Sequence, residues 1–201
     1  MVEGPKCSPW LKRIVSGQTG ADRGAFDAAI ACGIEYGGWC PRGRLAEDGT
    51  IPERYQNVSE TDSAQYPVRT EKNVIDSDGT LIFHSREPHG KGCGDGCVGK
   101  GSSHDTTKDY CCVPEQPHNN LFGGTAYTLE MAKHHHKPYF IVNAREFDLS
   151  VRDGVHDVKS VRQWISDHRI RVLNCAGPRE SDCPGIHAQT FRLLQEMLRS
   201  E

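Results

Sequence analysis

The sequence feature that most constrains the fold is the stretch from Arg13 to Gly33, which reads RIVSGQTGADRGAFDAAIACG. Its short apolar start, its glycine loop and the helical repeat of apolar residues that follows predict a strand, a tight turn and a helix. We expect Thr19 to cap the helix with its side chain, and Asp22 to lie in the first turn. A helix that starts directly after a glycine loop presents unpaired N–H groups, which suit a phosphate or another anion. The alternative is a turn that only caps its helix, because short glycine turns are common in α/β proteins.

The length and charge of the chain exclude several classes of protein. Its 201 residues suit a single domain, residues 1–201, with an ordinary core. The 24 Lys and Arg residues are balanced by 27 Asp and Glu, so no basic surface for nucleic acid is expected. No apolar run approaches the length of a membrane span, and residues 1–12 lack the apolar segment of a secretion signal. We therefore expect a cytoplasmic protein with no nucleic-acid or membrane partner, and a flexible lead-in over residues 1–12.

Strands and helices are expected to alternate along the rest of the chain. Short apolar runs and segments of helical periodicity follow one another, whereas residues 51–66 are polar and irregular and predict a loop. This alternation predicts an α/β fold, namely a Rossmann-like open parallel sheet with helices on both faces. Polar residues and glycines collect where the predicted strands end. We therefore expect one ligand cleft at the carboxyl edge of the sheet.

A series of motifs spans nearly the whole chain from Arg13 to the C-terminal helix. They comprise residues 14–23 (IVSGQTGADR), 37–49 (GGWCPRGRLAEDG), 69–70 (RT), 73–74 (NV), 76–82 (DSDGTLI), 123–125 (GGT) and 174–181 (NCAGPRES). In this order they resemble the molybdenum cofactor (Moco) carrier proteins, a branch of the SLOG group of Rossmann-like ligand-binding folds. The resemblance implies a non-enzymatic homo-oligomer that binds and shelters Moco. It also implies molybdoenzymes or Moco biosynthesis proteins as partners.

The same motifs supply the residues that we expect to bind Moco. Moco is a pterin with a terminal phosphate, a dithiolene and an oxo-anionic molybdenum, so it is anionic at two ends. Backbone N–H groups of the first glycine loop, bidentate arginines, amide or carboxylate side chains and threonine hydroxyls could contact it. The predicted set is Ser16, Gly17, Gln18, Thr19, Gly20, Arg44, Arg69, Asn73, Asp78, Gly79, Thr80, Gly123, Gly124, Thr125, Asn174 and Arg179.

Several of these residues also have a structural interpretation. Glu47 and Asp48 are near enough in the sequence to pair with Arg44 in place of a ligand. An Asp-Gly pair before a strand, such as Asp78-Gly79, is ordinary turn chemistry. Trp39 is more typical of packing at a loop than of stacking on a pterin. The sequence leaves both interpretations open for these positions.

Residues 88–120 depart from the family pattern, in which the strand after Asp78-Gly79-Thr80 runs almost directly into Gly-Gly-Thr. This Cys/His-rich insertion has almost no apolar residues, so it cannot bury a core of its own. A disulfide, an insertion of no chemical consequence, dimer contacts and a lid over the cleft are all alternatives. The remaining hypothesis is a structural zinc site, drawn from Cys93, Cys97, His104, Cys111, Cys112 and His118.

The sequence favours a carrier over an enzyme, because no nucleophile–base pair or paired carboxylates stand out. The alternative is a nucleotide-binding SLOG-type enzyme such as a nucleoside-monophosphate phosphoribohydrolase. In that enzyme Glu47, Asp48 or Asp78 would act beside Arg44 or Arg69. Against it, residues 123–128 lack the acid that ends the glycine signature of those enzymes. A metal- or redox-sensing module built on residues 88–120 is a third hypothesis.

Overall fold

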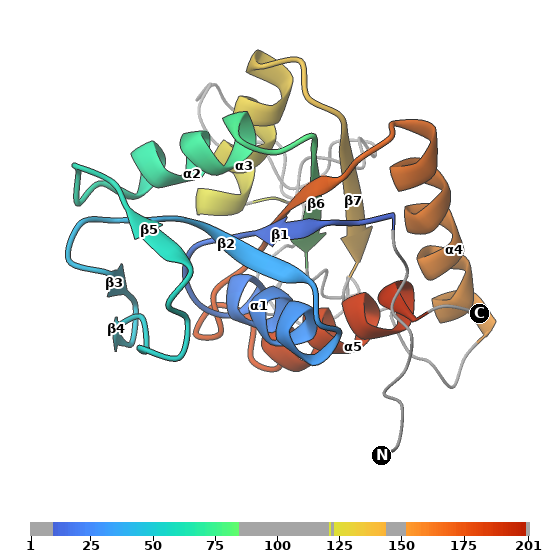
Figure 1. The fold of residues 1–201 in the computed structure, drawn as a ribbon, viewed down its shortest axis with the longest axis horizontal. Coiled ribbons are helices and arrows are strands. Elements are labelled where there is room, and N and C mark those ends of the chain that lie inside the picture. The colour runs from blue at the N-terminus through green and yellow to red at the C-terminus, as the bar shows by residue number, and fades with distance from the viewer. Residues whose placement is uncertain (1–9, 85–120, 122, 144–151, 200–201) are drawn as a thin grey trace, which may run out of the picture.

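The computed structural model describes residues 10–84, 121, 123–143 and 152–199, and its centre is a six-stranded sheet (Figure 1). The order across the sheet is β5-β2-β1-β8-β6-β7, and every neighbouring pair is parallel. The bounds are β1 Arg13–Val15, β2 Glu35–Cys40, β5 Val58–Glu60, β6 Gly79–His84, β7 Tyr139–Asn143 and β8 Val172–Ala176. The predicted open parallel sheet is confirmed.

Helices cover both faces of this sheet, as predicted (Figure 1). On one face α1 (Ala21–Ala31) packs along α5 (Ile186–Leu198), and α4 (Arg152–Asp167) contacts α5 and β7. On the other face α2 (Tyr66–Ile75) lies beside α3 (Gly123–His134). An antiparallel hairpin of β3 (Leu45–Ala46) and β4 (Gly49–Thr50) stands apart from the sheet. Among the helices that the structure describes, none is long and apolar enough to cross a membrane.

The main core lies between the strands and the helices α1, α4 and α5. Ile14 of β1 pairs with Tyr36 of β2 and with Leu173 of β8, so the central strands present apolar side chains to these helices. Leu11 belongs to this core and is 3% exposed. The prediction of a flexible lead-in is therefore wrong for residues 10–12, while residues 1–9 lie outside the described part of the chain.

A second, smaller core explains a strand that the sequence did not indicate. Tyr55 and Val58 are buried with Phe26 of α1, and the Phe26 and Tyr55 rings lie 5.4 Å apart between centroids. Because Val58 packs here, the segment that begins with it, Val58–Glu60, pairs with β2 and forms β5. The prediction that residues 51–66 form only a loop is wrong, since burial of two side chains fixes this segment against the sheet.

Candidate functional site

A cavity of about 790 Å³ opens at the carboxyl ends of β1, β6 and β8, the edge of the sheet predicted to carry the cleft. Gln18 and Thr19 follow β1, His84 ends β6, and residues 176–179 end β8 and continue beyond it. The N-terminal turns of α2 and α3 complete the wall. The pocket therefore lies at the carboxyl edge of the sheet, between the start of α1 on one face and the starts of α2 and α3 on the other.

The inner wall of this pocket contains a buried ion pair. The Asp22 Oδ2 atom accepts from Gly17 N at 3.2 Å and from Arg69 Nη1 at 3.1 Å. The second arginine nitrogen, Nη2, donates to Gln18 Oε1 at 3.0 Å. Burial raises the pKa of Asp22, although the charge of Arg69 and the hydrogen bond from Gly17 act in the opposite direction. Asp22 was predicted only as an acid in the first helical turn, so its place in the pocket wall is a finding of the structure.

The start of α1 is closed by the protein itself. Gly20 is the N-cap residue, and a Cβ atom there would clash with the Pro178 carbonyl oxygen. Ala21 N donates to that same oxygen at 3.2 Å, while Gly17 N is used by Asp22. Two donors at the start of α1, the N–H groups of Gly17 and Ala21, are therefore already bound within the protein. The side chains of Gln18 and Thr19 line the pocket instead.

The predicted N-cap role of Thr19 is also wrong. Its hydroxyl donates to Glu47 Oε1 at 2.6 Å and makes no capping hydrogen bond to α1. Ser16 lies behind the loop, where its hydroxyl donates to the Cys175 carbonyl oxygen at 2.6 Å. Cys175 is buried, and burial raises the pKa of its thiol. Neither Ser16 nor Cys175 lines the pocket.

The start of α3, in contrast, is open to the pocket. Gly123, Gly124 and Thr125 all belong to its wall. A Cβ atom at Gly123 or Gly124 would meet no atom within 4 Å among the described residues. The first N–H groups of a helix have no intrahelical partner, so this turn offers donors and the positive end of the helix dipole beside the cavity. Arg179 lines the same cavity, and its guanidinium carbon lies 5.2 Å from the centre of the Tyr66 ring.

Arg44 is held away from the pocket, contrary to the prediction. Its guanidinium donates to the carbonyl oxygens of Val58 at 3.1 Å and Tyr55 at 3.0 Å, and more weakly to two others. Neither Glu47 nor Asp48 pairs with it, so the alternative carboxylate pairing is wrong as well. Arg44 instead closes the loop between β4 and β5, because that loop turns its carbonyl groups inward.

Asp78, Gly79 and Thr80 were predicted to contact the ligand but do not reach it. Asp78 precedes β6, so it lies at the amino edge of the sheet, where its Oδ2 accepts from the N–H groups of Arg171 and Val172. Gly79 and Thr80 follow it at the start of β6 and are buried. The pocket is at the opposite edge, and the Asp78 carboxylate instead ties the start of β6 to the start of β8, a contact that neither the ligand prediction nor the turn interpretation describes.

The side chains of the two predicted asparagines also bind other parts of the protein. Asn174 pairs with Thr80 inside the sheet, and its Nδ2 donates to Thr80 Oγ1 at 3.3 Å. Asn73 holds the backbone of Trp39, accepting from its N–H at 2.7 Å and donating to its carbonyl oxygen at 3.2 Å. Trp39 itself donates from its ring to Asp76 and lies under the Lys72 ammonium, so it packs at the loop as the alternative interpretation has it. None of these side chains lines the pocket.

Tyr66 and Tyr127 line the pocket but were not predicted. Tyr66 is the first residue of α2. Pro67 was the available signal, because proline is favoured in the first turn of a helix. Tyr127 lies one turn into α3, and only the position of that helix reveals its role.

The structure offers no support for a zinc site. Where residues are described, no group of three or more His, Cys, Asp or Glu side chains could hold a metal ion. Residues 88–120 lie outside the described part of the chain. The hypotheses of an insertion without chemical consequence, a disulfide and a lid all concern this segment and therefore stay predictions. The six zinc candidates, Cys93, Cys97, His104, Cys111, Cys112 and His118, fall in this segment.

The fold and the pocket define a Rossmann-like α/β protein with a cavity at the carboxyl edge of a parallel sheet. The chain belongs to the circularly permutated YpsA SLOG family (cpYpsA), whose sequence model matches residues 14–121 and 115–198. This confirms the SLOG resemblance that the motifs predicted.

A solved structure covers almost the whole length. It is the crystal structure of a protein from Syntrophus aciditrophicus SB that bears the name "Putative molybdenum carrier protein". The two chains are 36% identical over 98% of each, with a TM-score of 0.71. A comparison with curated proteins finds no match.

Proposed function

We propose that this protein binds Moco and protects, stores or delivers it without catalysis. One observation carries the proposal: a single cavity of about 790 Å³ combines Arg69, Arg179 and the open first turn of α3. Two arginines and the first turn of a helix suit a ligand with two anionic ends. The relative that is 36% identical and named a molybdenum carrier supports the same ligand class.

We assign the phosphate end of Moco to the first turn of α3. Gly123 and Gly124 leave the backbone there accessible, whereas the start of α1 is occupied by Pro178 and Asp22. Backbone N–H groups at a helix start bind phosphate without a side chain. Arg179 would supply the charge beside this turn, because a guanidinium can contact phosphate through two nitrogens.

The residues deeper in the pocket fit an acceptor-rich group. Gln18 is 4% exposed, and its Nε2 has no hydrogen-bond partner among the described residues; the same holds for Arg69 Nε. A buried donor without a partner costs free energy, and a ligand oxygen would remove that cost. The pterin and the oxo-molybdenum end of Moco both carry such oxygens. Gln18 and Arg69 would therefore hold the end of the ligand opposite the phosphate.

Retention of Moco tests this proposal. Purified protein is incubated with Moco under anaerobic conditions and passed through a desalting column, and the molybdenum and pterin that elute with it are measured. We expect retention by the wild type and its loss in Arg69→Ala and Arg179→Ala. Arg192→Ala, an exposed arginine on α5, serves as the control and should retain Moco. A wild type that retains no Moco would refute the carrier function.

A second candidate function rests on the Asp22–Arg69 pair. An acid beside an arginine in a phosphate pocket is the arrangement expected for a nucleoside-monophosphate phosphoribohydrolase. Of the acids considered for that role, Asp78 lies at the amino edge, and Glu47 and Asp48 lie outside the pocket. Asp22 and Asp182 are the acids that line the pocket among the described residues, and Asp22 is the one beside an arginine, although Gly17 and Arg69 occupy its carboxylate. Release of free adenine from AMP would favour this enzyme over the carrier.

The partners follow from the carrier function. We infer that the protein acts in the cytoplasm, assembles into a homo-oligomer, and exchanges Moco with molybdoenzymes or Moco biosynthesis proteins. Light scattering on a size-exclusion column measures the assembly. Transfer is measured by the activity that a cofactor-free molybdoenzyme gains from the loaded protein.

A further inference from the structure

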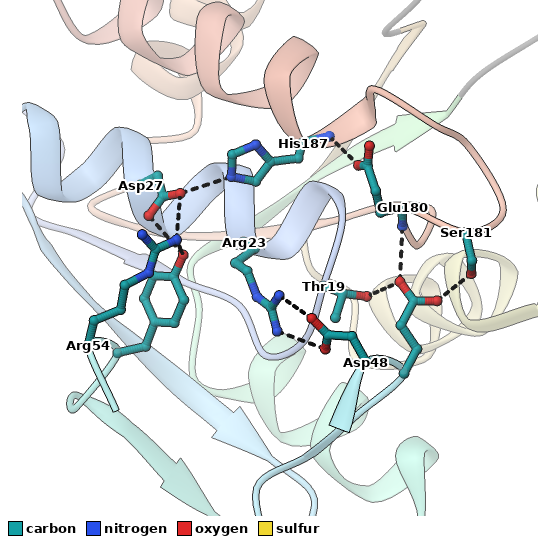
Figure 2. A network of polar contacts seen from close by, with 10 residues as sticks. Thr19, Arg23, Asp27, Asp48, Arg54, Glu180, Ser181 and His187 are labelled. Atoms are coloured by element: carbon teal, nitrogen blue, oxygen red, sulfur yellow. Dashed lines mark hydrogen bonds and ion pairs between the residues drawn. The ribbon is translucent and has the colours of Figure 1, made fainter. Parts of the chain in front are cut away.

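Outside the pocket, one carboxylate binds two other segments of the chain to its own. Glu47 lies in the turn of the β3–β4 hairpin, and its Oε1 accepts from Thr19 Oγ1 at 2.6 Å and from Glu180 N at 3.2 Å. Its Oε2 accepts from the Ser181 hydroxyl. Figure 2 labels Thr19, Glu180, Ser181 and the neighbouring Asp48, and dashed lines mark the hydrogen bonds that the first three donate to the Glu47 carboxylate.

The segments joined by Glu47 are two walls of the ligand pocket. Thr19 follows β1 and lines the cavity, and Glu180 and Ser181 directly follow Arg179, which lines it from the other side. The two loops also touch at Gly20, where only a missing Cβ lets Pro178 approach. The positions of Thr19 and Arg179 therefore depend on each other, and Glu47 is the side chain that holds the two loops together.

The charge of Glu47 matches this role. Partial burial acts to raise the pKa of its carboxyl group, but the hydrogen bonds from Ser181 and Thr19 and the nearby charge of Arg179 outweigh it and lower the pKa. An ionised carboxylate accepts hydrogen bonds more strongly than a neutral group. The hairpin that carries Glu47 is itself fixed, since Arg44 binds the carbonyl oxygens of the following loop.

We propose that Glu47 is a positioning residue for ligand binding, which holds the Thr19 loop and the Arg179 loop at the separation that the ligand requires. Glu47 does not line the pocket, so it acts through these two loops. The inference rests on the proposed carrier function and adds to it a residue outside the pocket that controls how firmly the ligand is held.

The test compares Glu47→Ala with Glu47→Gln in the full-length protein. Two quantities are measured: the rate of Moco release, and hydrogen exchange of peptides that cover residues 16–20 and 178–185 without ligand. Glu47→Ala should release Moco about tenfold faster, the effect of losing charge-assisted hydrogen bonds. Exchange should rise in both peptides. Glu47→Gln should release Moco and exchange hydrogen at rates close to those of the wild type, because its side-chain oxygen still accepts from Thr19 and Glu180. Glu53→Ala removes an exposed acid before β5 and is the matched control.

Each outcome separates this inference from the carrier function. Release from Glu47→Ala at the wild-type rate overturns the positioning role, even where exchange rises, and leaves the carrier function intact. Faster release together with unchanged exchange in peptides 16–20 and 178–185 overturns it too. A wild type that retains no Moco refutes the carrier function. Hydrogen exchange in Glu47→Ala then decides by itself whether Glu47 joins the two loops. Faster exchange than in the wild type supports that role, and unchanged exchange overturns it.

Discussion

The Arg69 guanidinium donates to the Asp22 carboxylate across 3.1 Å, and both side chains line the ligand pocket. Each is largely buried, at 12% and 6% side-chain exposure. In the absence of ligand, Asp22 therefore neutralises the charge that would attract an anion. A ligand anion that contacts Arg69 meets the Asp22 carboxylate next to it, and like charges in a buried site repel strongly.

The first prediction concerns this pair. Asp22→Asn should bind sulfate more tightly than the wild type at pH 7, by about tenfold, or about 1.4 kcal/mol. Asparagine still accepts from Gly17 and Arg69, but it removes the negative charge. In the wild type the affinity for sulfate should rise as the pH falls toward the raised pKa of Asp22, because protonation removes the repulsion. Isothermal titration calorimetry from pH 5 to 8 measures both effects.

Sulfate is the probe because its charge is constant over this pH range. Arg69→Ala is the companion variant and should lose sulfate affinity at every pH. If Asp22→Asn binds sulfate as poorly as Arg69→Ala does, Asp22 supports the site rather than opposing the anion.

A second prediction separates Arg44 from the ligand. Arg44→Ala should lower the free energy of unfolding by about 2–4 kcal/mol, because several carbonyl oxygens lose a charged donor. Arg42→Ala, an exposed arginine two residues earlier, should change it little. Urea unfolding measures the difference. Arg44→Ala protein that is folded should still retain Moco. Loss of Moco retention together with unchanged stability would instead indicate that Arg44 contacts the ligand.

Much of this fold could be predicted because it depends on local patterns. The apolar pair Ile14-Val15 followed by a glycine loop determines a strand and a helix wherever it occurs. The carboxyl-edge rule then places Gln18, Thr19 and Arg179 in one pocket. The same rule excludes Asp78 from that pocket, since a residue that precedes a strand lies at the amino edge.

Other contacts could not be predicted, because they join residues far apart in the sequence. Glu47 meets Glu180 and Ser181 across more than 130 positions, and no local pattern marks that pair. β5 has only three residues, and Val58 alone of them is buried, so its sequence lacks a strand signature. Tertiary packing decides such cases.

A third prediction concerns the contact between α1 and α5. A Cβ atom at Gly24 would clash with the His187 carbonyl oxygen and contact Thr190, so the helices approach closely only because this residue is glycine. Gly24→Ala should therefore destabilise the protein by about 1–3 kcal/mol, the usual cost of overpacking. Gly124→Ala is the control, because a Cβ there meets no atom within 4 Å in the described structure. Equal melting temperatures for the two variants would contradict the prediction.

The last prediction concerns the pH dependence of the Glu47 contacts. The pKa of Glu47 is lowered from 4.5, so its ionised form is favoured in the folded protein. The resulting stabilisation is fully present above pH 4.5 and is lost as the pH falls through the lowered pKa. Glu47→Gln should accordingly be less stable than the wild type at pH 7, by less than about 1 kcal/mol because the group is partly exposed. The difference should narrow as the pH falls below 4.5 and through the lowered pKa.

Urea unfolding of both proteins at pH 7, 5, 4 and 3 measures this difference. Glu53→Gln removes an equal charge from an exposed position and corrects for the change in net charge. Because a protonated carboxyl group accepts more weakly than a carboxylate, the same acid titration should lower the hydrogen-exchange protection factor of the Glu180 amide in the wild type and not in Glu47→Gln. A stability difference that stays constant as the pH falls below 4.5 would show that shape rather than charge carries the effect of Glu47.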